Sequence, residues 1–291
     1  MPSTATFSAG GGEYNVYDPV EHMQTVSFQV TSPITLITCD YFITVSAGSS
    51  GNANQRRMLR GAEQLDYNIY TTAAKTAVVK PLGSAGAGEV VTGLFPALLG
   101  VGQSQNKSFF WTIPPQQVRS GSATRFQDGS LTVTLYAGLL LGLYQQVDTR
   151  SITFQTRVES SMDLSLVDTG GAFNLGDTAQ TVDFGTLSSG AVRSYDTLVR
   201  SNNAYRVTLQ SQNAQRLQHV MQPGHYVPYN ISMDGVSVDL SGGNAVQALA
   251  RSGVTPAAGD RLQTQITIGS MTGIENPGNY SDVITVTVSA Q

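Results

Sequence analysis

Apolar and polar residues alternate with a period of two along most of the chain. The clearest runs are residues 26–30, 131–135, 205–209, 236–240 and 284–288, in which Ser, Thr, Gln, Asp or Arg separate the apolar side chains. Because successive side chains of a β-strand point to opposite faces, each run predicts a strand with one buried and one solvated face. The runs are short and are separated by Gly, Asn, Asp and Pro, as in β-sandwiches. The chain is therefore predicted to be all-β.

Two stretches of the chain, residues 108–137 and 262–290, share one order of residue types. Each contains a strand, a polar turn, a glycine, an aromatic residue, an aspartate and a second alternating strand. The aspartates are Asp128 and Asp282. Such an internal repeat is expected when two homologous domains follow one another.

A second correspondence supports the same division. Leu-Asp-Tyr-Asn-Ile at residues 65–69 matches Val-Pro-Tyr-Asn-Ile at 227–231, a similar distance before each ending. We therefore predict two β-sandwich domains, residues 1–147 and 148–291, joined near residues 145–151.

The composition excludes several classes of protein. Asp, Glu, Lys and Arg make up 12% of the residues, where soluble domains contain about 25%. The chain has only three lysines, Lys75, Lys80 and Lys107, and a formal net charge of −4. Long amphipathic helices with solvated Lys and Glu are not expected. A nucleic-acid partner is not expected either, because affinity for phosphates depends on clustered Lys and Arg. The many Thr, Ser, Gln, Asn and Gly residues fit an extracellular β-protein.

The single cysteine and the short apolar stretches exclude further classes of protein. The sole cysteine, Cys39, excludes an intramolecular disulfide, a multi-cysteine zinc site and Cys-x-x-Cys redox chemistry. Apolar stretches such as residues 137–143 are far shorter than the ~20 residues that a membrane-spanning helix needs. Residues 1–12 lack the basic and apolar regions of a signal peptide, so an exported form is expected to have lost that signal.

Several motifs of the first half together resemble one family. They resemble the spore coat U domain, which occurs in subunits of archaic, Csu-type chaperone–usher pili. The motifs are Tyr-Asn-Val-Tyr-Asp-Pro at residues 14–19, Cys-Asp-Tyr-Phe-Ile-Thr-Val-Ser-Ala-Gly at 39–48, Arg57-Met58, residues 65–70, Ile-Pro-Pro-Gln at 113–116 and residues 126–135.

The second half looks like the pilin domain of the two-domain subunits of such pili, which in this family are normally the tip adhesins. Its motifs are residues 182–185, 200–202, 205–209, 210–213 and 279–282. The resemblance implies two tandem immunoglobulin-like sandwiches. It also implies a secreted protein at the pilus tip on the bacterial surface, reached through the periplasm.

The resemblance further implies how the subunit would be assembled. A pilin domain of this family lacks one strand, which a periplasmic chaperone supplies first and the N-terminal extension of the adjacent subunit supplies later, at an outer-membrane usher. This is β-strand addition, in which backbone hydrogen bonds give affinity and alternate side chains give register. We expect the second domain to be the acceptor, with its groove wall formed by Val283, Ile284, Val286 and Val288.

The beginning of the chain bears on its place in the fibre. A donor segment should alternate over about ten residues, yet residues 1–12 offer only Ala5 and Phe7 before three glycines. We therefore expect a subunit that caps the fibre, unless the N-terminus is truncated. The family's first domain also opens with a strand whose cysteine pairs with the equivalent of Cys39, and neither is visible in this sequence.

One apolar loop of the first domain is the candidate for surface attachment. Pro and three glycines make residues 90–102 loop-like although many of them are apolar, and exposed apolar loops mark interaction sites. Family tip adhesins use apolar hairpins to bind abiotic surfaces, and an abiotic or host surface is the expected partner. The alternative is that Leu94, Phe95 and Leu98 close the bottom of the sandwich. The predicted contact residues are Leu94, Phe95, Pro96, Ala97, Leu98, Leu99 and Val101.

Three other features have a functional and a structural interpretation. Residues 137–143 form a second apolar loop, which we expect to continue the last strand and pack at the joint between the domains. Arg56, Arg57 and Arg60 would suit anionic polymers, but such a trio more often lies on a solvated turn. Trp111 alternates with other apolar residues, which favours the core over sugar stacking.

Enzymatic interpretations are weaker. Asp-Thr-Gly at residues 168–170 has the form found in aspartic proteases, but those need two such aspartates, and a turn is the simpler interpretation. His22, His219 and His225 have no metal-ligand spacing. Gly-x-Ser-x-Gly and phosphate-binding loops are absent, so no enzyme, metal or cofactor is predicted. The alternative functions are a structural pilin or spore-coat-like shell protein and, third, a single-Asp-Thr-Gly protease.

Overall fold

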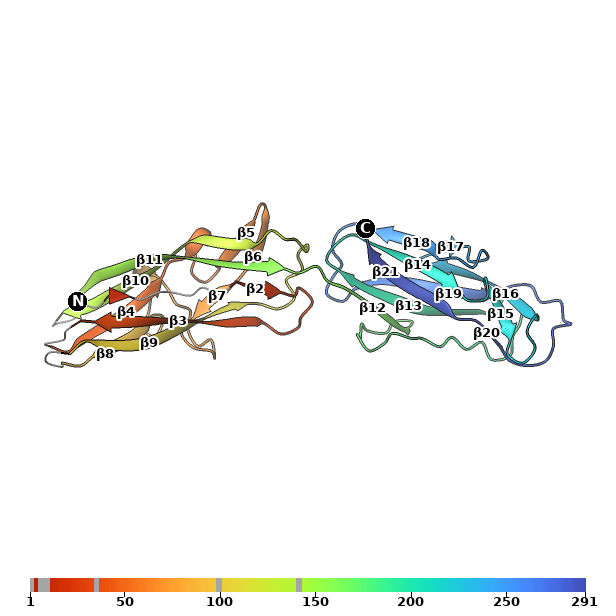
Figure 1. Ribbon diagram of the computed structural model, residues 1–291, viewed down its shortest axis with the longest axis horizontal. Coiled ribbons are helices and arrows are strands. Elements are labelled where there is room, and N and C mark those ends of the chain that lie inside the picture. Colours follow the sequence, from red (N-terminus) through yellow and green to blue (C-terminus); the bar gives the residue numbers. More distant parts are fainter. Residues whose placement is uncertain (1–2, 5–10, 34–36, 98–100, 140–142) are drawn as a thin grey trace. The chain divides into compact units, whose positions relative to one another are not determined.

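The prediction of an all-β chain is confirmed by the computed structural model (Figure 1). In the parts of the chain described below, the helical elements are two 3-10 turns, η1 (Gly48–Ser50) and η2 (Leu82–Ser84). No helix in these parts is long and apolar enough to cross a membrane. The structure describes residues 3–4, 11–33, 37–97, 101–139 and 143–291.

The chain divides into two compact units, Met1–Glu159 and Ser160–Gln291, each an immunoglobulin-like sandwich of two sheets. The division falls later along the chain than the predicted joint at residues 147–148. That joint lies inside one continuous strand, β11, whose side chains Ile152 and Phe154 are buried in the core of the first unit. The strand therefore belongs to the first unit along its whole length.

In the first unit, one sheet has the strand order β1-β3-β9-β7 and the other the order β2-β11-β10-β4-β8, with β5 pairing with β10 and β6 with β5. Alternating apolar residues from both sheets form its core. The strands are β1 (Ser3–Thr4), β2 (Gly11–Tyr14), β3 (His22–Ser32), β4 (Cys39–Val45), β5 (Arg57–Arg60), β6 (Glu63–Asp66), β7 (Asn68–Tyr70), β8 (Val91–Phe95), β9 (Gln103–Ile113), β10 (Phe126–Leu139) and β11 (Leu143–Val158).

The opening segment of the first unit is divided between its two sheets. β1 pairs antiparallel with β3, whereas β2 pairs parallel with β11, with Tyr14 opposite Val158. The Tyr14 side chain is buried, and its hydroxyl donates a hydrogen bond to the carbonyl of Pro114 at 2.7 Å. The first unit therefore opens with two short strands, neither of which contains a cysteine.

In the second unit, one sheet has the order β12-β13-β19-β16-β15-β20, with β17 beside β16, and the other has only β18-β14-β21. The strands are β12 (Met162–Asp168), β13 (Val192–Ser201), β14 (Tyr205–Ser211), β15 (Arg216–His219), β16 (Tyr226–Met233), β17 (Val236–Val238), β18 (Val246–Arg251), β19 (Asp260–Ile268), β20 (Tyr280–Ser281) and β21 (Ile284–Ala290).

The repeat seen in the sequence has a structural cause. In the first unit the Tyr67 hydroxyl donates a hydrogen bond to Asp128 Oδ2 at 2.8 Å, and in the second the Tyr229 hydroxyl donates to Asp282 Oδ2 at 2.6 Å. Both correspondences in the sequence thus mark the two ends of one tyrosine–aspartate contact. In the first unit Tyr67 lies between β6 and β7 and Asp128 lies in β10, whereas in the second Tyr229 lies in β16 and Asp282 just before β21.

Candidate functional site

The strands β3, β8 and β10 end at the same end of the first unit, which we call the apical end (Figure 1). The strand registers place Cys39, at the start of β4, opposite Phe95, at the end of β8. They also place Leu139 opposite Leu143, where β10 leads into β11. The connections that follow β3, β8 and β10 therefore all leave their sheets at the apical end.

Large apolar side chains are exposed there. Ile37 is 48% exposed, Leu94 50%, Val101 54% and Leu143 68%. They come from all three connections and their flanking strands. Pro96 and Ala97 are also exposed, whereas the predicted contact residues Leu98 and Leu99 lie outside the described residues.

The prediction that Phe95 contacts a surface is wrong, because this side chain is fully buried. Its ring stacks on that of Tyr41, with 5.1 Å between the centroids. Gly93, two positions before Phe95 on β8, leaves room for the Tyr41 ring, since a Cβ on Gly93 would lie 2.2 Å from Cζ of Tyr41. Strand alternation then turns Leu94 outward, so the core interpretation holds for Phe95 and fails for Leu94.

Residues 137–139 continue β10, as predicted for the stretch 137–143, but neither they nor Leu143 lie near the end of the first unit where the chain leaves it. β11 begins at Leu143 and is 16 residues long, and the chain leaves the first unit just after its other end, Val158. A hairpin reverses the chain, so residues close to a boundary in sequence lie a full strand length away from it. The described residues of this apolar stretch, 137–139 and Leu143, therefore lie at the apical end.

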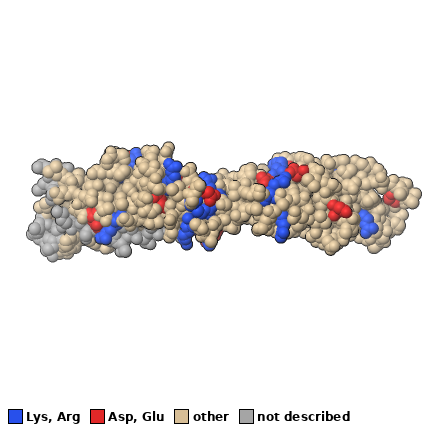
Figure 2. Space-filling view, turned by 90° about the horizontal axis from the view of Figure 1, so that it is seen from above, with Lys and Arg blue, Asp and Glu red and all other residues tan. Residues whose placement is uncertain are grey.

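Figure 2 shows that charged side chains are few and scattered on the face in view. Neither interpretation of the arginine trio holds for Arg56, which is fully buried and donates hydrogen bonds to Asn68 Oδ1 and to backbone carbonyls, including that of Val79 at 2.7 Å. Burial lowers the pKa of Arg56 to about 10. Arg60 pairs with Glu63, so the trio is not a free cationic patch.

Trp111 is fully buried, as predicted, and stacks on Phe154 with 5.0 Å between the ring centroids. Asp168 ends β12 and begins a turn, as predicted: Gly171 N donates to its carbonyl at 2.8 Å and Gly170 has a φ of 87°. Among the described residues, no group of three or more His, Cys, Asp or Glu could hold a metal ion.

The second candidate site is an open edge of the second unit. β21 pairs with β14 alone and β12 with β13 alone, as far as the structure describes the chain. In the first unit the equivalent strand β10 is paired on both sides, by β4 and β11. β21 and β12 are thus edge strands of the two sheets of the second unit. Only part of the β12 edge is covered, where Leu166 N donates to the carbonyl of Asp177 at 2.7 Å.

Apolar side chains along this edge are only partly buried. On β14, Val207 and Leu209 are fully buried, whereas Val286 and Val288 on β21 remain partly exposed although they pack on the same core. Predicted wall residue Val283 differs, being 59% exposed and outside that core. The partly buried side chains on the two edges and the adjoining loop are Met162, Leu164, Leu166, Val182, Phe184, Leu187, Ile284, Val286 and Val288.

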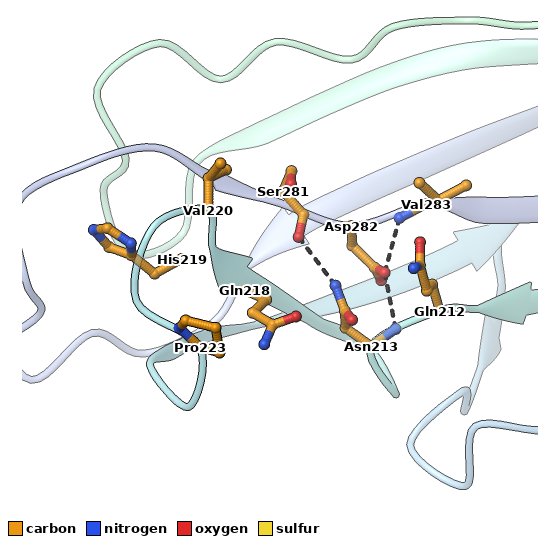
Figure 3. Close-up of a pocket in the computed structure, with 9 residues that line it drawn as sticks. All are labelled: Gln212, Asn213, Gln218, His219, Val220, Pro223, Ser281, Asp282 and Val283. Carbon is orange, nitrogen blue, oxygen red and sulfur yellow. Dashed lines mark hydrogen bonds between the residues drawn. The ribbon is translucent and has the colours of Figure 1, made fainter.

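A small pocket of about 240 Å³ lies where β21 begins (Figure 3). Asp282 closes one side of it by accepting hydrogen bonds from the backbone N–H groups of Asn213 and Val283, at 2.9 and 2.8 Å. The pocket holds no paired acid and base. Its lining residues are Gln212, Asn213, Gln218, His219, Val220, Pro223, Ser281, Asp282 and Val283.

His219 in this pocket is occupied by its own loop. Its Nδ1 atom accepts hydrogen bonds from the backbone N–H groups of Met221 and Gln222 at 3.1 and 3.0 Å, and Nε2 lies 3.1 Å from the carbonyl oxygen of Pro277. With both ring nitrogens engaged, His219 organises the loop. No pattern in the sequence indicated this role of His219.

Comparison with known proteins gives one family match. Residues 4–134 match the Spore Coat Protein U domain. A search of the curated proteins found no match to the chain.

Solved structures give weaker matches. The chain is 14% identical to a chain in the crystal structure of the CsuC–CsuE chaperone–tip adhesion subunit pre-assembly complex from archaic chaperone–usher Csu pili of Acinetobacter baumannii, with a TM-score of 0.44 over 99% of both chains. It is 10% identical to the CupB6 tip adhesin from Pseudomonas aeruginosa, with a TM-score of 0.35 over 98% of this chain and 94% of that one. Neither match assigns a function to the chain.

Proposed function

Because the first unit carries a Spore Coat Protein U domain over residues 4–134, we propose that the chain is the tip adhesin of an archaic chaperone–usher pilus. In this role the apical end attaches the pilus to hydrophobic surfaces and promotes biofilm formation. The observation that carries the proposal is the exposure of Ile37, Leu94, Val101 and Leu143 at that end. Contiguous exposed apolar side chains are costly in water and gain free energy when a surface covers them.

The open edge of the second unit supports the assembly part of the proposal. An extended segment lying between β12 and β21 would pair with the free edge of β21, and its apolar side chains would cover Ile284, Val286 and Val288. A periplasmic chaperone would supply that strand first. The adjacent pilin subunit would supply it after transfer at the outer-membrane usher, which places the finished subunit outside the cell. Such strand addition combines backbone pairing with side-chain register.

Substitution at the apical end tests the adhesive role. Leu94→Ser combined with Leu143→Ser removes two apolar side chains that are half or more exposed, so the melting temperature should hardly change. Attachment of the full chain to polystyrene should fall severalfold. Leu59→Ser is a matched control, because Leu59 is 41% exposed on β5, away from the apical end.

Binding is measured on polystyrene and on a hydrophilic glass reference, with melting followed by circular dichroism. Unchanged attachment of the double variant, with an unchanged melt, would remove the adhesive function. The chain would then be a structural subunit, which needs the open edge of the second unit but not an apolar end on the first.

A further inference from the structure

The hairpin formed by β10 and β11 extends past the strand that supports it. β4 pairs with β10 only as far as Tyr41 opposite Ala137. Beyond that point, Gly138 and Leu139 pair only with Tyr144 and Leu143 of the same hairpin. A two-stranded ribbon is marginally stable by itself in water. Contacts other than backbone pairing must therefore hold the exposed Leu143 in place.

Aromatic rings supply such contacts on the outer face of the sheet. Phe42 and Tyr136 are direct cross-strand partners. Phe42 is buried, but neither residue packs in the main core cluster of the unit. Their rings stack with 4.9 Å between centroids, and the Tyr144 ring meets Phe42 edge-on at 4.8 Å. Outward positions of a sheet normally carry polar side chains. Here three aromatic rings connect β4, β10 and β11, and such ring pairs add stability beyond their buried area.

A polar contact holds the same hairpin two strand positions beyond the pair Phe42 and Tyr136, closer to the tip. The Tyr144 hydroxyl donates a hydrogen bond of 2.5 Å to Asp40 Oδ2, and this bond raises the pKa of Tyr144. Gly138 lies between the two, where a Cβ would be 2.1 Å from Asp40 Oδ1 and 3.1 Å from Tyr144 Cε1. The glycine leaves the space that the contact needs. On the other side of Asp40, β8 places Leu94 as its cross-strand partner.

We propose that Asp40, Phe42, Tyr136 and Tyr144 form a brace that positions the β10–β11 hairpin at the apical end. The brace keeps Leu143 at the apical end, one strand position beyond the row formed by Leu94, Asp40 and Tyr144. The role of the brace in adhesion rests on the proposed function. The positioning itself is a property of the fold and can be measured without any surface.

The test uses the full chain with Tyr144→Phe and Asp40→Asn, singly and together. Tyr136→Phe is the matched control, because it keeps a ring of the brace and its hydroxyl has no hydrogen-bond partner among the described residues. We expect amide hydrogen exchange over residues 136–146 to speed up about tenfold in Tyr144→Phe, as the loss of one hydrogen bond to a charged group predicts. Exchange elsewhere should be unchanged. The double variant should match Tyr144→Phe, because the hydrogen bond that Asp40→Asn weakens is already lost in Tyr144→Phe.

Attachment to polystyrene is measured on the same variants and should fall in Tyr144→Phe and Asp40→Asn but not in Tyr136→Phe. Unchanged hydrogen exchange in Tyr144→Phe overturns the brace. Lost attachment with unchanged exchange also overturns it, since Tyr144 would then contact the surface directly.

Faster exchange with full attachment, in a protein whose Leu94→Ser/Leu143→Ser variant no longer attaches, would overturn the positioning role in adhesion. If that leucine variant still attaches while Tyr144→Phe exchanges faster, the brace stands and the proposed function fails.

Discussion

The two units follow one sandwich plan but differ in how completely they bury their apolar residues. Among the described residues, the core of the first unit has 26 buried side chains and two that are partly buried. The core of the second has 16 buried and 14 partly buried. The difference follows from one strand: β10 has a neighbour on each side, and its counterpart β21 has one on a single side. A sandwich can therefore keep its fold while leaving a strand-sized part of its core uncovered.

The largest expected effect is on the stability of the separated units. Isolated Met1–Glu159 should melt cooperatively without additives, whereas isolated Ser160–Gln291 should melt early and broadly, because its groove leaves apolar side chains exposed to water. A ten-residue peptide with alternating apolar residues should stabilise the second unit alone. At a hundredfold excess over Kd the gain is about 2.7 kcal/mol, or roughly 10 °C in Tm.

Calorimetry with the peptide and with a scrambled version of it measures this effect. A second unit that unfolds cooperatively at a peptide-independent temperature would contradict both the acceptor assignment and the contrast between the two cores.

A smaller effect should separate two equivalent valines. Val133 on β10 is 2% exposed, whereas Val286 at the matching position of β21 is only partly buried. Val133→Ala should cost roughly 2 kcal/mol, since truncation in a closed core leaves a cavity. Val286→Ala should cost less than ~1 kcal/mol in the free chain and instead weaken donor-peptide binding about tenfold.

Urea denaturation and peptide titration measure the two consequences, with outward-facing Thr287→Ala as the control. Equal losses of stability at the two valines, with unchanged peptide affinity, would mean that the edge of the second unit is already closed.

The sequence was sufficient to predict the alternating strands and the repeat, because period-two alternation depends directly on burial. Prediction from the sequence failed where the alternation of apolar and polar residues is interrupted. A register shift between Leu135 and Tyr136 interrupts the pairing of β10 with β11, so the strand that contains the predicted joint does not alternate regularly. Arg56 was misassigned for another reason. Backbone carbonyls converge on it from segments distant in sequence, and only the fold brings them together.

The smallest expected difference concerns the repeated tyrosine–aspartate contact. Tyr67→Phe and Tyr229→Phe each remove a hydroxyl that donates to a carboxylate, Asp128 or Asp282. Asp282 keeps a bond of 2.5 Å from the Ser211 hydroxyl, together with two backbone N–H donors. The loss of Tyr229 should therefore cost about 1 kcal/mol or less.

Asp128 is 1% exposed and keeps only backbone donors, Ser49 N at 3.2 Å and Ser130 N at 3.1 Å. A buried carboxylate that loses its shortest hydrogen bond is poorly compensated, so Tyr67→Phe should cost about 2 kcal/mol. Urea denaturation of the full chain, followed by Trp111 fluorescence for the first unit and by circular dichroism for both, separates the two costs. Tyr136→Phe controls for removal of a hydroxyl as such. A larger cost for Tyr229→Phe than for Tyr67→Phe would show that the donors around Asp282 do not replace one another, and that the repeated contact stabilises the open unit more than the closed one.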